Sequence, residues 1–392
     1  MVSLPTNVTF CGGQISTCLE AWKSLTSDPI ILQIVKGEVI EFRDGPLINH
    51  GAFSPVFSSE EISVIDGEIQ TLLDKQVITI CGREEVEYFS PIFATSKADG
   101  GHRLILNLKH LNEEVVYHHF KMDSIKTVLQ LVTQNCYMCK IDLKDAYYSV
   151  PVAPEFQRCL KFEWKDTLYK FVCLPNGLAS CPRRFTKLLK VVLSVLRLQG
   201  VTICGYIDDF FIVAQQFQQS IASTAKVVSM FTNLGFYIHP IKSILEPKQE
   251  MEFLGFLINS VTMTVSLTHK KKAALKKLVN QLLTIHKPKI RFVAKVLGTM
   301  VAAFPASKYG PLYYRNIDMD KTMALKAQCG NFEASMILSS ASVQELRWWK
   351  AHIDTMYNWI TPPSIDSEMA CDASDLAWGV DYFQCSGGGM GY

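Results

Sequence analysis

The sequence predicts an α+β fold in which helices cover one face of a mainly antiparallel sheet. Apolar, β-prone runs occur in pairs joined by turn residues, at positions 90–112, 162–174 and 201–214. Amphipathic helical segments follow these pairs, whereas a doubly wound parallel sheet requires single strands that alternate with helices. The chain of 392 residues is 48% hydrophobic, which is enough to build the cores of two or more domains.

Composition narrows the class of protein. The formal net charge is only +2, so bulk charge indicates no particular partner. No uninterrupted apolar run reaches the ~18 residues of a membrane span, so we expect no membrane partner. The twelve cysteines are scattered, which is typical of a reducing compartment. We therefore expect an intracellular protein, cytoplasmic or nuclear, that is not secreted.

Residues 1–85 show weaker secondary-structure patterns than the rest of the chain. We expect them to form an N-terminal extension packed on the domain that follows. Positions 30–40 are apolar with one Lys-Gly interruption, which favours a pair of strands. Ser58 and Glu61 form a capping box. Apolar residues then recur at helical spacing, so a helix is predicted from this box to about Lys75.

A hairpin is predicted at positions 90–112, because two apolar runs flank the turn signal at 98–101. Lys97 and Arg103 lie near its tip, where their cations can bind phosphates. The alternative is a solvated hairpin tip with ordinary surface charges.

The next segments place an acidic residue at the end of a strand. Asp123 is predicted to cap a short helix, and a strand at 138–143 then carries Asp142 at its carboxyl end. An alternative role for Asp142 is that of a helix N-cap. The segment 174–185 is a shaped loop, with Pro182 in the first turn of a helix, where its missing N–H costs little.

The stretch 201–214 reads as a hairpin with an acidic turn. Tyr206 and Asp208 are expected on one face of it, because side chains alternate along a strand. The adjacent carboxylates of Asp208 and Asp209 repel each other, and a divalent cation such as magnesium would compensate them. The alternative is an ordinary Asp-Asp turn on the surface. A helix is predicted at 221–234.

Beyond Glu252 no acidic residue occurs until Asp318. Two helices are predicted there, one capped by Thr268 and one at 291–304. Solubility alone would mix the signs of charge, so this stretch favours contact with a phosphate backbone. The alternative is a solvated face. The basic residues are Lys270, Lys271, Lys272, Lys276, Lys277, Lys287, Lys289, Arg291, Lys295, Lys308 and Arg315.

The last part of the chain gives fewer signals. Residues 316–366 are expected to be a connection, with Trp348, Trp349 and Trp359 as packing anchors. The tail is predicted as two strands, the first of which carries Asp372, and two strands are too few for a domain.

Five motifs now stand in one order: KIDLKDAYYSVP with Asp142, LPNGLASCPRRF, YIDD, LGF with Lys242, and FLGF at 253–256. Together they resemble the motifs of a retroelement reverse transcriptase. SDPIILQIVKG, LNLKHLN, GLASCPRRFTK and FPASKYGPLYYR are most similar to DIRS-like, tyrosine-recombinase retrotransposons. CDASDLAWGV resembles the opening of a ribonuclease H domain, of which only Asp372 is present. We therefore expect a fragment with an incomplete ribonuclease H domain.

The resemblance implies a right-hand polymerase fold with fingers, an antiparallel-sheet palm and a helical thumb. It divides the chain into an N-terminal extension at 1–85, fingers and palm at 86–260, a thumb at 261–315, a connection at 316–366, and a truncated ribonuclease H-like start at 367–392.

The resemblance also implies the activity of an RNA-directed DNA polymerase. Such an enzyme extends a DNA primer on an RNA or DNA template with deoxynucleoside triphosphates. Two Mg²⁺ ions, with Mn²⁺ as a possible substitute, would be held by Asp142, Asp208, Asp209 and the Leu143 carbonyl. Ribonuclease H activity is not expected of this fragment.

Other roles follow residue by residue from the resemblance. Lys97 and Arg103 would clamp the triphosphate, helped by the backbone N–H groups of Asp145 and Ala146. Tyr147 would be a steric gate against the ribose 2′-hydroxyl. The remaining assignments are Asn176 and Gly177 beside the base and sugar, Lys242 as proton donor to pyrophosphate, and Tyr206, Phe253, Leu254, Gly255, Lys270, Lys271, Lys276 and Lys277 along the primer and template.

Two other functions stay open. A viral RNA-dependent RNA polymerase uses a similar palm, but the bulky Tyr147 argues against ribonucleotides. A non-catalytic, nucleic-acid-binding transposon remnant is the second, and the intact acidic residues Asp142, Asp208 and Asp209 argue against it.

Overall fold

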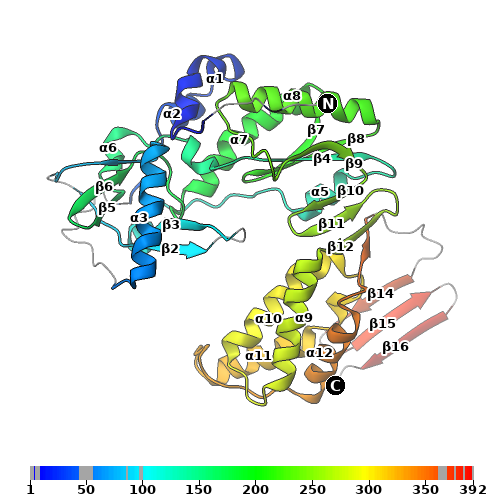
Figure 1. Cartoon of the computed structure of the whole chain (residues 1–392). Helices are drawn as coiled ribbons and strands as arrows, with labels where there is room; N and C mark the ends of the chain where they lie inside the picture. Colours follow the sequence, from blue (N-terminus) through cyan, green and yellow to red (C-terminus); the bar gives the residue numbers. More distant parts are fainter. Residues whose placement is uncertain are drawn as a thin grey trace. The chain divides into compact units, whose positions relative to one another are not determined.

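The structure is a computed structural model that describes residues 4, 9–43, 56–84, 87–96, 100–360, 369–374, 377–382 and 385–390. The chain divides into two compact units, Met1–Leu254 and Gly255–Tyr392. Figure 1 shows helices and strands in both units, which agrees with the predicted α+β class.

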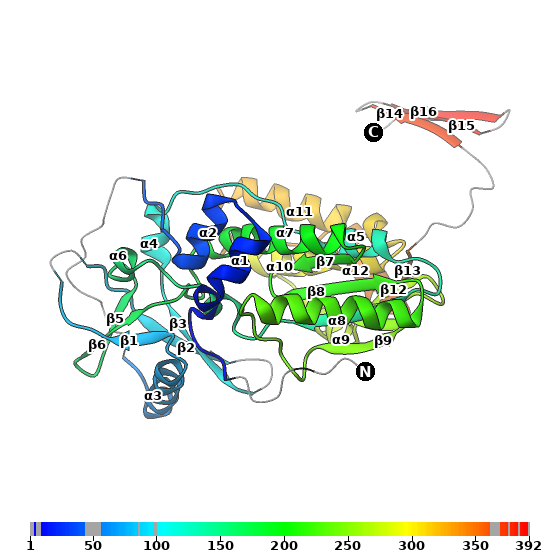
Figure 2. The same cartoon turned by 90° about the horizontal axis from the view of Figure 1, so that it is seen from above.

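A four-stranded antiparallel sheet forms the centre of the first unit. Its order is β7 (Thr202–Tyr206), β8 (Asp209–Ala214), β4 (Tyr137–Asp142) and β9 (Ile244–Lys248). Helix α7 (Cys181–Leu198) packs on β7, and α8 (Phe217–Asn233) packs on β8, β4 and β9 (Figure 2). The predicted antiparallel sheet with helical cover is confirmed.

The predicted hairpins are also present. Strands β2 (Ile92–Ser96) and β3 (His102–Leu106) pair with each other, and β5 (Lys161–Trp164) pairs with β6 (Thr167–Phe171). Strand β1 (Ile78–Ile80) adds to the other edge of β6. The predicted helix after the capping box is α3 (Ser59–Asp74), where the Glu61 N–H donates to Ser58 Oγ and the Ser58 N–H donates to Glu61 Oε2.

Positions 30–40 do not form the expected pair of strands. They hold helix α2 (Pro29–Lys36), which starts with proline and ends at Gly37. The Asp28 carboxylate accepts a hydrogen bond from the Ile30 N–H at 2.8 Å, so the helix is capped. Ile31, Ile34 and Val35 are buried at helical spacing, and this periodicity outweighs the β propensity of isoleucine and valine.

Two helix starts differ from the predictions. Helix α5 (Ile125–Leu131) is capped by Ser124. Asp123 instead accepts a hydrogen bond from the Gly205 N–H at 3.3 Å and lies 3.6 Å from Arg197 Nη2. Helix α8 begins at Phe217, earlier than predicted. The other short elements of this unit are the 3₁₀ helices η1 (Gln14–Cys18) and η2 (Ala146–Ser149), the helices α1 (Leu19–Leu25), α4 (Lys109–Glu114) and α6 (Pro154–Gln157), and the strand β10 (Glu250–Phe253).

The second unit contains a helical bundle. Its helices are α9 (His269–Thr284), α10 (Ile290–Ala303), α11 (Arg315–Ala327) and α12 (Ser340–His352), and they pack in the cycle α9, α10, α11, α12 and back to α9. The short 3₁₀ helices η3 (Phe304–Ala306) and η4 (Gly310–Leu312) join α10 to α11. An antiparallel sheet of β11 (Phe256–Asn259), β12 (Thr264–Leu267) and β13 (Asn358–Trp359) completes it.

The bundle changes the expected division of this part of the chain. We predicted a thumb that ends at 315 and a connection at 316–366, but α11 and α12 supply half of the bundle. The reason is tertiary packing: Trp349 is fully buried and donates its Nε1–H to the Tyr313 carbonyl at 2.7 Å. Trp359 is 40% exposed at the end of the edge strand β13, so its predicted anchoring role is wrong.

The tail has three strands, where two were predicted. Strands β14 (Met369–Ala373), β15 (Ala377–Tyr382) and β16 (Cys385–Met390) form an antiparallel sheet, and Asp372 on β14 lies opposite Gly379. Glycine has low β propensity, so the glycine-rich β16 gave no strand signal, and pairing with β15 decides its conformation. No helix among the described residues is long and apolar enough to cross a membrane.

Residues 10–14 are held between α3 and the loop after β4, and Gly12 leaves no room for a side chain. Its N–H donates to the Lys75 carbonyl at 2.7 Å, and a Cβ there would lie 2.5 Å from Gln76 O. We expect Gly12→Ala to lower the free energy of unfolding by ~1–3 kcal/mol, because backbone must shift. Thermal melting measures this. Gly67→Ala on α3 is the control, since its Cβ meets nothing within 4 Å; equal melting of the two variants would contradict the prediction.

Lys161 is fully buried and neutralises two acidic side chains. Its Nζ lies 2.8 Å from Glu87 Oε2 and 2.9 Å from both Glu84 Oε1 and the Gly82 carbonyl. We expect Lys161→Met to cost ~3 kcal/mol of stability in urea unfolding, because it leaves buried Glu87 without its main cation. The double variant Lys161→Met with Glu87→Gln should recover part of this loss. A wild-type urea midpoint for Lys161→Met would rule the argument out.

Candidate active site

A polar pocket of about 320 Å³ lies where β4 ends, beside the turn that joins β7 to β8. Its walls come from segments far apart in the sequence: the end of α3, strand β3, the loop after β4, the segment before α7 and the loop after α8. The residues that line it are Lys75, Arg103, Asp142, Leu143, Lys144, Asp145, Ala146, Tyr147, Tyr148, Asn176, Ile207, Asp208, His239 and Lys242.

Two carboxylates belong to this pocket. Asp142 is the last residue of β4, and the next N–H, that of Leu143, donates to the Asp208 carbonyl at 2.8 Å. This backbone bond fastens the turn with Asp208 to the end of β4. Burial, followed by the charge of Asp209, raises the pKa of Asp142. Burial and the charges of Asp209 and Asp142 raise the pKa of Asp208 to about 6.

Asp209 differs from the other two acids. Its Oδ1 lies 2.9 Å from Lys140 Nζ, so the two side chains form an ion pair. Asp209 does not line the pocket. Among the described residues, no group of three or more His, Cys, Asp or Glu side chains is placed to hold a metal ion. Asp209 nevertheless pairs with Asp142 across the β4–β8 ladder, and its charge helps raise the pKa values of Asp142 and Asp208. The cage of Asp142, Asp208 and Asp209 stays a prediction.

The turn between β7 and β8 has two residues and begins one residue earlier than the predicted Asp208-Asp209 pair. Tyr206 pairs with Asp209, so Ile207 and Asp208 form the turn itself. Asp208 therefore lies in the turn, where strand alternation does not set its direction relative to Tyr206. Ile207 has φ of 55°, which is unusual for a β-branched residue and stores strain in this turn.

Positive charge lines the same pocket. Arg103 comes from β3, and Lys144 follows Leu143, with its Nζ 5.5 Å from the centroid of the Tyr237 ring. Lys242 lies close enough to Asp142 and Asp208 to oppose the rise of their pKa values. The structure therefore brings Arg103 and Lys242 together with the acids, while Lys97 lies outside the described residues.

The loop after β4 presents the predicted nucleotide-binding residues. Asp145 has φ of 52° and stands at the N-terminus of η2, which begins with Ala146. The ring of Tyr147 meets Phe185 edge-on, with centroids 5.4 Å apart. The Asn176 Nδ2 donates to the hydroxyl of the buried Tyr148 at 2.9 Å.

Several predicted residues lie elsewhere. Gly177, with φ of 104°, does not line the pocket, and its carbonyl accepts from Asn112 Nδ2 at 2.9 Å. Phe253 is buried against the Phe211 ring, and Leu254 and Gly255 form a turn at positive φ. The remaining residues belong to the second unit: Lys270 and Lys277 are exposed on α9, Lys271 Nζ lies 4.5 Å from the Phe256 ring, and Lys276 forms an ion pair with Asp354.

The sequence reasoning missed five residues that line the pocket. Lys144 and Tyr148 are neighbours of motif residues, so their proximity was a usable signal. Ile207 was hidden inside YIDD. Lys75 and His239 come from segments with no chemical motif, and His239 is placed by its N–H bond to the Asp142 carbonyl at 2.8 Å.

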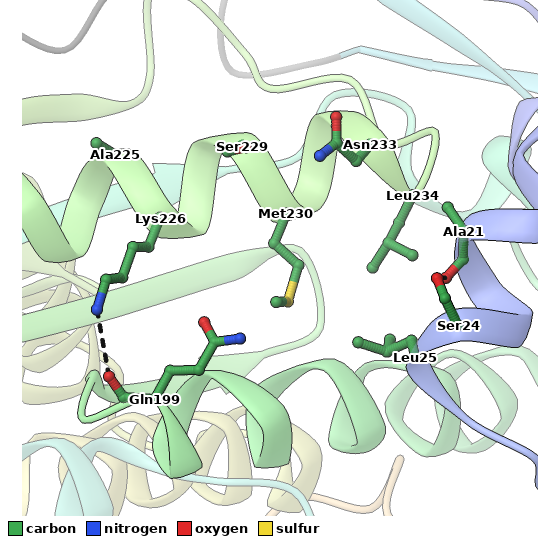
Figure 3. Close-up of a pocket in the computed structure, with 10 residues that line it drawn as sticks. All are labelled: Ala21, Ser24, Leu25, Gln199, Ala225, Lys226, Ser229, Met230, Asn233 and Leu234. Atoms are coloured by element: carbon green, nitrogen blue, oxygen red, sulfur yellow. Dashed lines mark hydrogen bonds between the residues drawn. The ribbon is translucent and has the colours of Figure 1, made fainter.

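A second and larger pocket, of about 540 Å³, lies between α1, the end of α7 and α8 (Figure 3). Of the residues drawn there, only Lys226 ionises, and its Nζ donates to the Gln199 carbonyl at 3.3 Å. The pocket thus offers no pair of acid and base groups, which makes it a poor candidate for catalysis.

Known proteins share the region that supplies most residues of the polar pocket. Residues 95–258 match the family model described as reverse transcriptase (RNA-dependent DNA polymerase). The Pro-Pol polyprotein of simian foamy virus type 1 is 26% identical over 216 residues, which is 54% of this chain and 17% of the polyprotein. The Gag-Pol polyprotein of avian reticuloendotheliosis virus is 29% identical over 174 residues, which is 42% of this chain and 15% of the polyprotein. The chain thus spans less than a fifth of these relatives.

Solved structures share the fold. The foamy viral protease-reverse transcriptase in complex with dsDNA has a TM-score of 0.67 at 17% identity, over 100% of this chain and 83% of that chain. Its complex with an RNA/DNA hybrid gives 0.65 at 16% identity, over 100% of this chain and 54% of that chain. The predicted right-hand polymerase fold is confirmed. Residues 95–258 thus match a reverse transcriptase domain, and the chain is similar to the Pol polyproteins of retroviruses.

Proposed function

We propose that this chain is the RNA-directed DNA polymerase of a retroelement, a nucleotidyltransferase that extends a primer on an RNA or DNA template. The observation that carries the proposal is one pocket that joins Asp142 and Asp208 to Arg103 and Lys242, inside the region that matches the family model. Such a pocket combines sites for hard cations with sites for phosphates.

The donor set fits magnesium. Asp142 is buried and Asp208 is half-buried, and their pKa values are raised by burial and by neighbouring negative charge. A divalent cation would relieve this repulsion. Together with the Leu143 carbonyl they would hold two Mg²⁺ ions, with Mn²⁺ as a substitute. When bound, these ions stabilise negative charge on the attacking and leaving oxygens of phosphoryl transfer. Asp209 would join them only by leaving Lys140.

The chain's own residues would hold the triphosphate. Arg103 supplies a planar cation suited to bidentate phosphate contacts. The N–H groups of Asp145 and Ala146 begin a 3₁₀ turn and can donate to phosphate oxygens. Lys242 lines the same pocket and would give a proton to the leaving pyrophosphate. Lys97 keeps its sequence-based role as a second clamp.

Tyr147 and Asn176 would select the sugar. Tyr147 lines the pocket, and its ring is braced by Phe185, so it would collide with a ribose 2′-hydroxyl. Asn176 is fixed by its bond to Tyr148, which would orient it toward the base and sugar. Gly177 stays a proposed border of this subsite through its backbone.

A template–primer duplex is the proposed nucleic-acid partner. The related foamy viral protein has been solved with dsDNA and with an RNA/DNA hybrid. Basic side chains of α9, among them the exposed Lys270 and Lys277, would contact the phosphates without reading sequence. Tyr206 and the turn at 253–255 would contact the primer.

The finer assignments rest on the sequence motifs. We propose a DIRS-like retrotransposon as the source, from GLASCPRRFTK and FPASKYGPLYYR. Residues 367–392 would open a ribonuclease H-like domain, and the three-stranded sheet with Asp372 on its first strand is consistent with this. The cysteines are all free thiols, which supports action inside the cell, in the cytoplasm or nucleus.

Primer extension tests the proposal directly. With Mg²⁺ and deoxynucleotides, the chain should lengthen a DNA primer on RNA and DNA templates. Ribonucleotides should be used poorly, whereas efficient ribonucleotide use would favour an RNA polymerase. Duplex binding without extension on any primed template would favour the non-catalytic remnant.

A further inference from the structure

We infer that Lys75, paired with Asp145, is a positioning residue that sets the affinity of the pocket for a nucleoside triphosphate; this inference rests on the function proposed above. Lys75 caps the C-terminus of α3 and lies outside the residues that match the family model. Its Nζ lies 2.6 Å from Asp145 Oδ2, and the two side chains are 27% and 24% exposed. Both residues line the polar pocket.

Asp145 presents a problem of charge that Lys75 resolves. The backbone N–H groups of Asp145 and Ala146 are proposed phosphate donors, yet the Asp145 carboxylate carries the same sign of charge as the triphosphate. The pocket already contains Asp142 and Asp208. A further uncompensated carboxylate in a partly buried site would repel the ligand more strongly than it would in water. The Lys75 ammonium cancels that charge while the N–H groups stay available.

The main chain fixes Lys75 in this position. Its carbonyl accepts a hydrogen bond from the Gly12 N–H at 2.7 Å, and its Nζ lies 6.0 Å from the ring centroid of Phe10. Gly13, which follows Gly12 in the chain, donates its N–H to the Tyr148 carbonyl at 2.8 Å. Residues 10–13 thus tie the end of α3 to the loop after β4, and the ion pair is held by its surroundings. An exposed ion pair would instead lose most of its value to solvent and side-chain entropy.

The test uses the whole chain on a primed template and measures kcat and KM for dTTP. Lys75→Ala should raise KM about tenfold, equal to about 1.4 kcal/mol of binding, with kcat within about twofold. Asp145→Asn, which removes the negative charge, should not raise KM. The double variant should return KM to within about threefold of wild type, because no charge is left to neutralise.

Lys165→Ala is the matched control. Lys165 Nζ lies 2.7 Å from Asp66 Oδ2 on α3, the helix that Lys75 caps, and this ion pair lies outside the pocket. Lys165→Ala should leave KM unchanged. An unchanged KM in Lys75→Ala would overturn the inference. A double variant as poor as Lys75→Ala would also overturn it, since Lys75 would then contact phosphate itself. If Lys75→Ala does not fold, a raised KM in Asp145→Asn alone is sufficient to reject the inference.

Failure of the polymerase proposal is distinguishable from failure of this one. If wild type extends no primer, the proposed function fails and kinetics give no answer. Calorimetric titration of dTTP with Mg²⁺ into wild type, Lys75→Ala, Asp145→Asn and the double variant then decides. Weaker binding to Lys75→Ala that Asp145→Asn restores would support the inference, and equal binding to all four would reject it.

Discussion

Asp208→Asn is expected to lower primer extension by ~10²–10³-fold, the scale seen when preorganised stabilisation of transition-state charge is removed. The variant keeps the shape of the side chain but removes the charge that would hold a divalent cation. Asp208 is half-buried, and the charges of Asp209 and Asp142 help raise its pKa, so the loss of its charge also relieves repulsion. We therefore expect the variant to melt at or above the wild-type temperature and to bind template–primer duplex normally.

Asp166→Asn is the control variant, because it makes the same substitution at an aspartate outside the pocket. Asp166 lies in the turn between β5 and β6 at φ of 61°, a conformation that asparagine also tolerates, and it does not line the pocket. Its extension rate should equal that of wild type. Extension by Asp208→Asn within tenfold of wild type would refute the assignment of Asp208 as a catalytic residue.

Tyr147→Val is expected to shift the choice of sugar. The Tyr147 ring is half enclosed against Phe185 and lines the pocket, so shortening it opens space beside the nucleotide. We expect the ratio of kcat/KM for ribonucleotides to that for deoxynucleotides to rise at least ~10-fold, because a steric clash worth ~1.4 kcal/mol or more is removed.

Tyr147→Phe separates the ring from its hydroxyl. It keeps the ring against Phe185, so discrimination between the two sugars should stay as in wild type. If Tyr147→Phe relaxed discrimination as much as Tyr147→Val, the hydroxyl would be the selective group and the steric argument would be wrong. Single-nucleotide incorporation with both sugar types measures each ratio.

Local patterns carried most of the fold prediction. The capping box of α3, Pro182 in the first turn of α7 and the paired runs of each hairpin are signals written within a few residues, and the structure follows them. The secondary-structure predictions were wrong where the intrinsic propensity of a segment disagrees with its packing. Positions 30–40 are β-prone by composition, but they form a helix that buries Ile31, Ile34 and Val35.

The sequence alone determined which charged groups this protein offers for chemistry, because the carboxylates of Asp142 and Asp208 and the cations of Arg103 and Lys242 are properties of residue type. Only the tertiary structure decided which of them share a pocket. It added Lys75 from a helix far upstream and turned Asp209 toward Lys140, because strand register and long-range hydrogen bonds set these distances. Such contacts depend on how distant segments pack, and no local pattern encodes that packing.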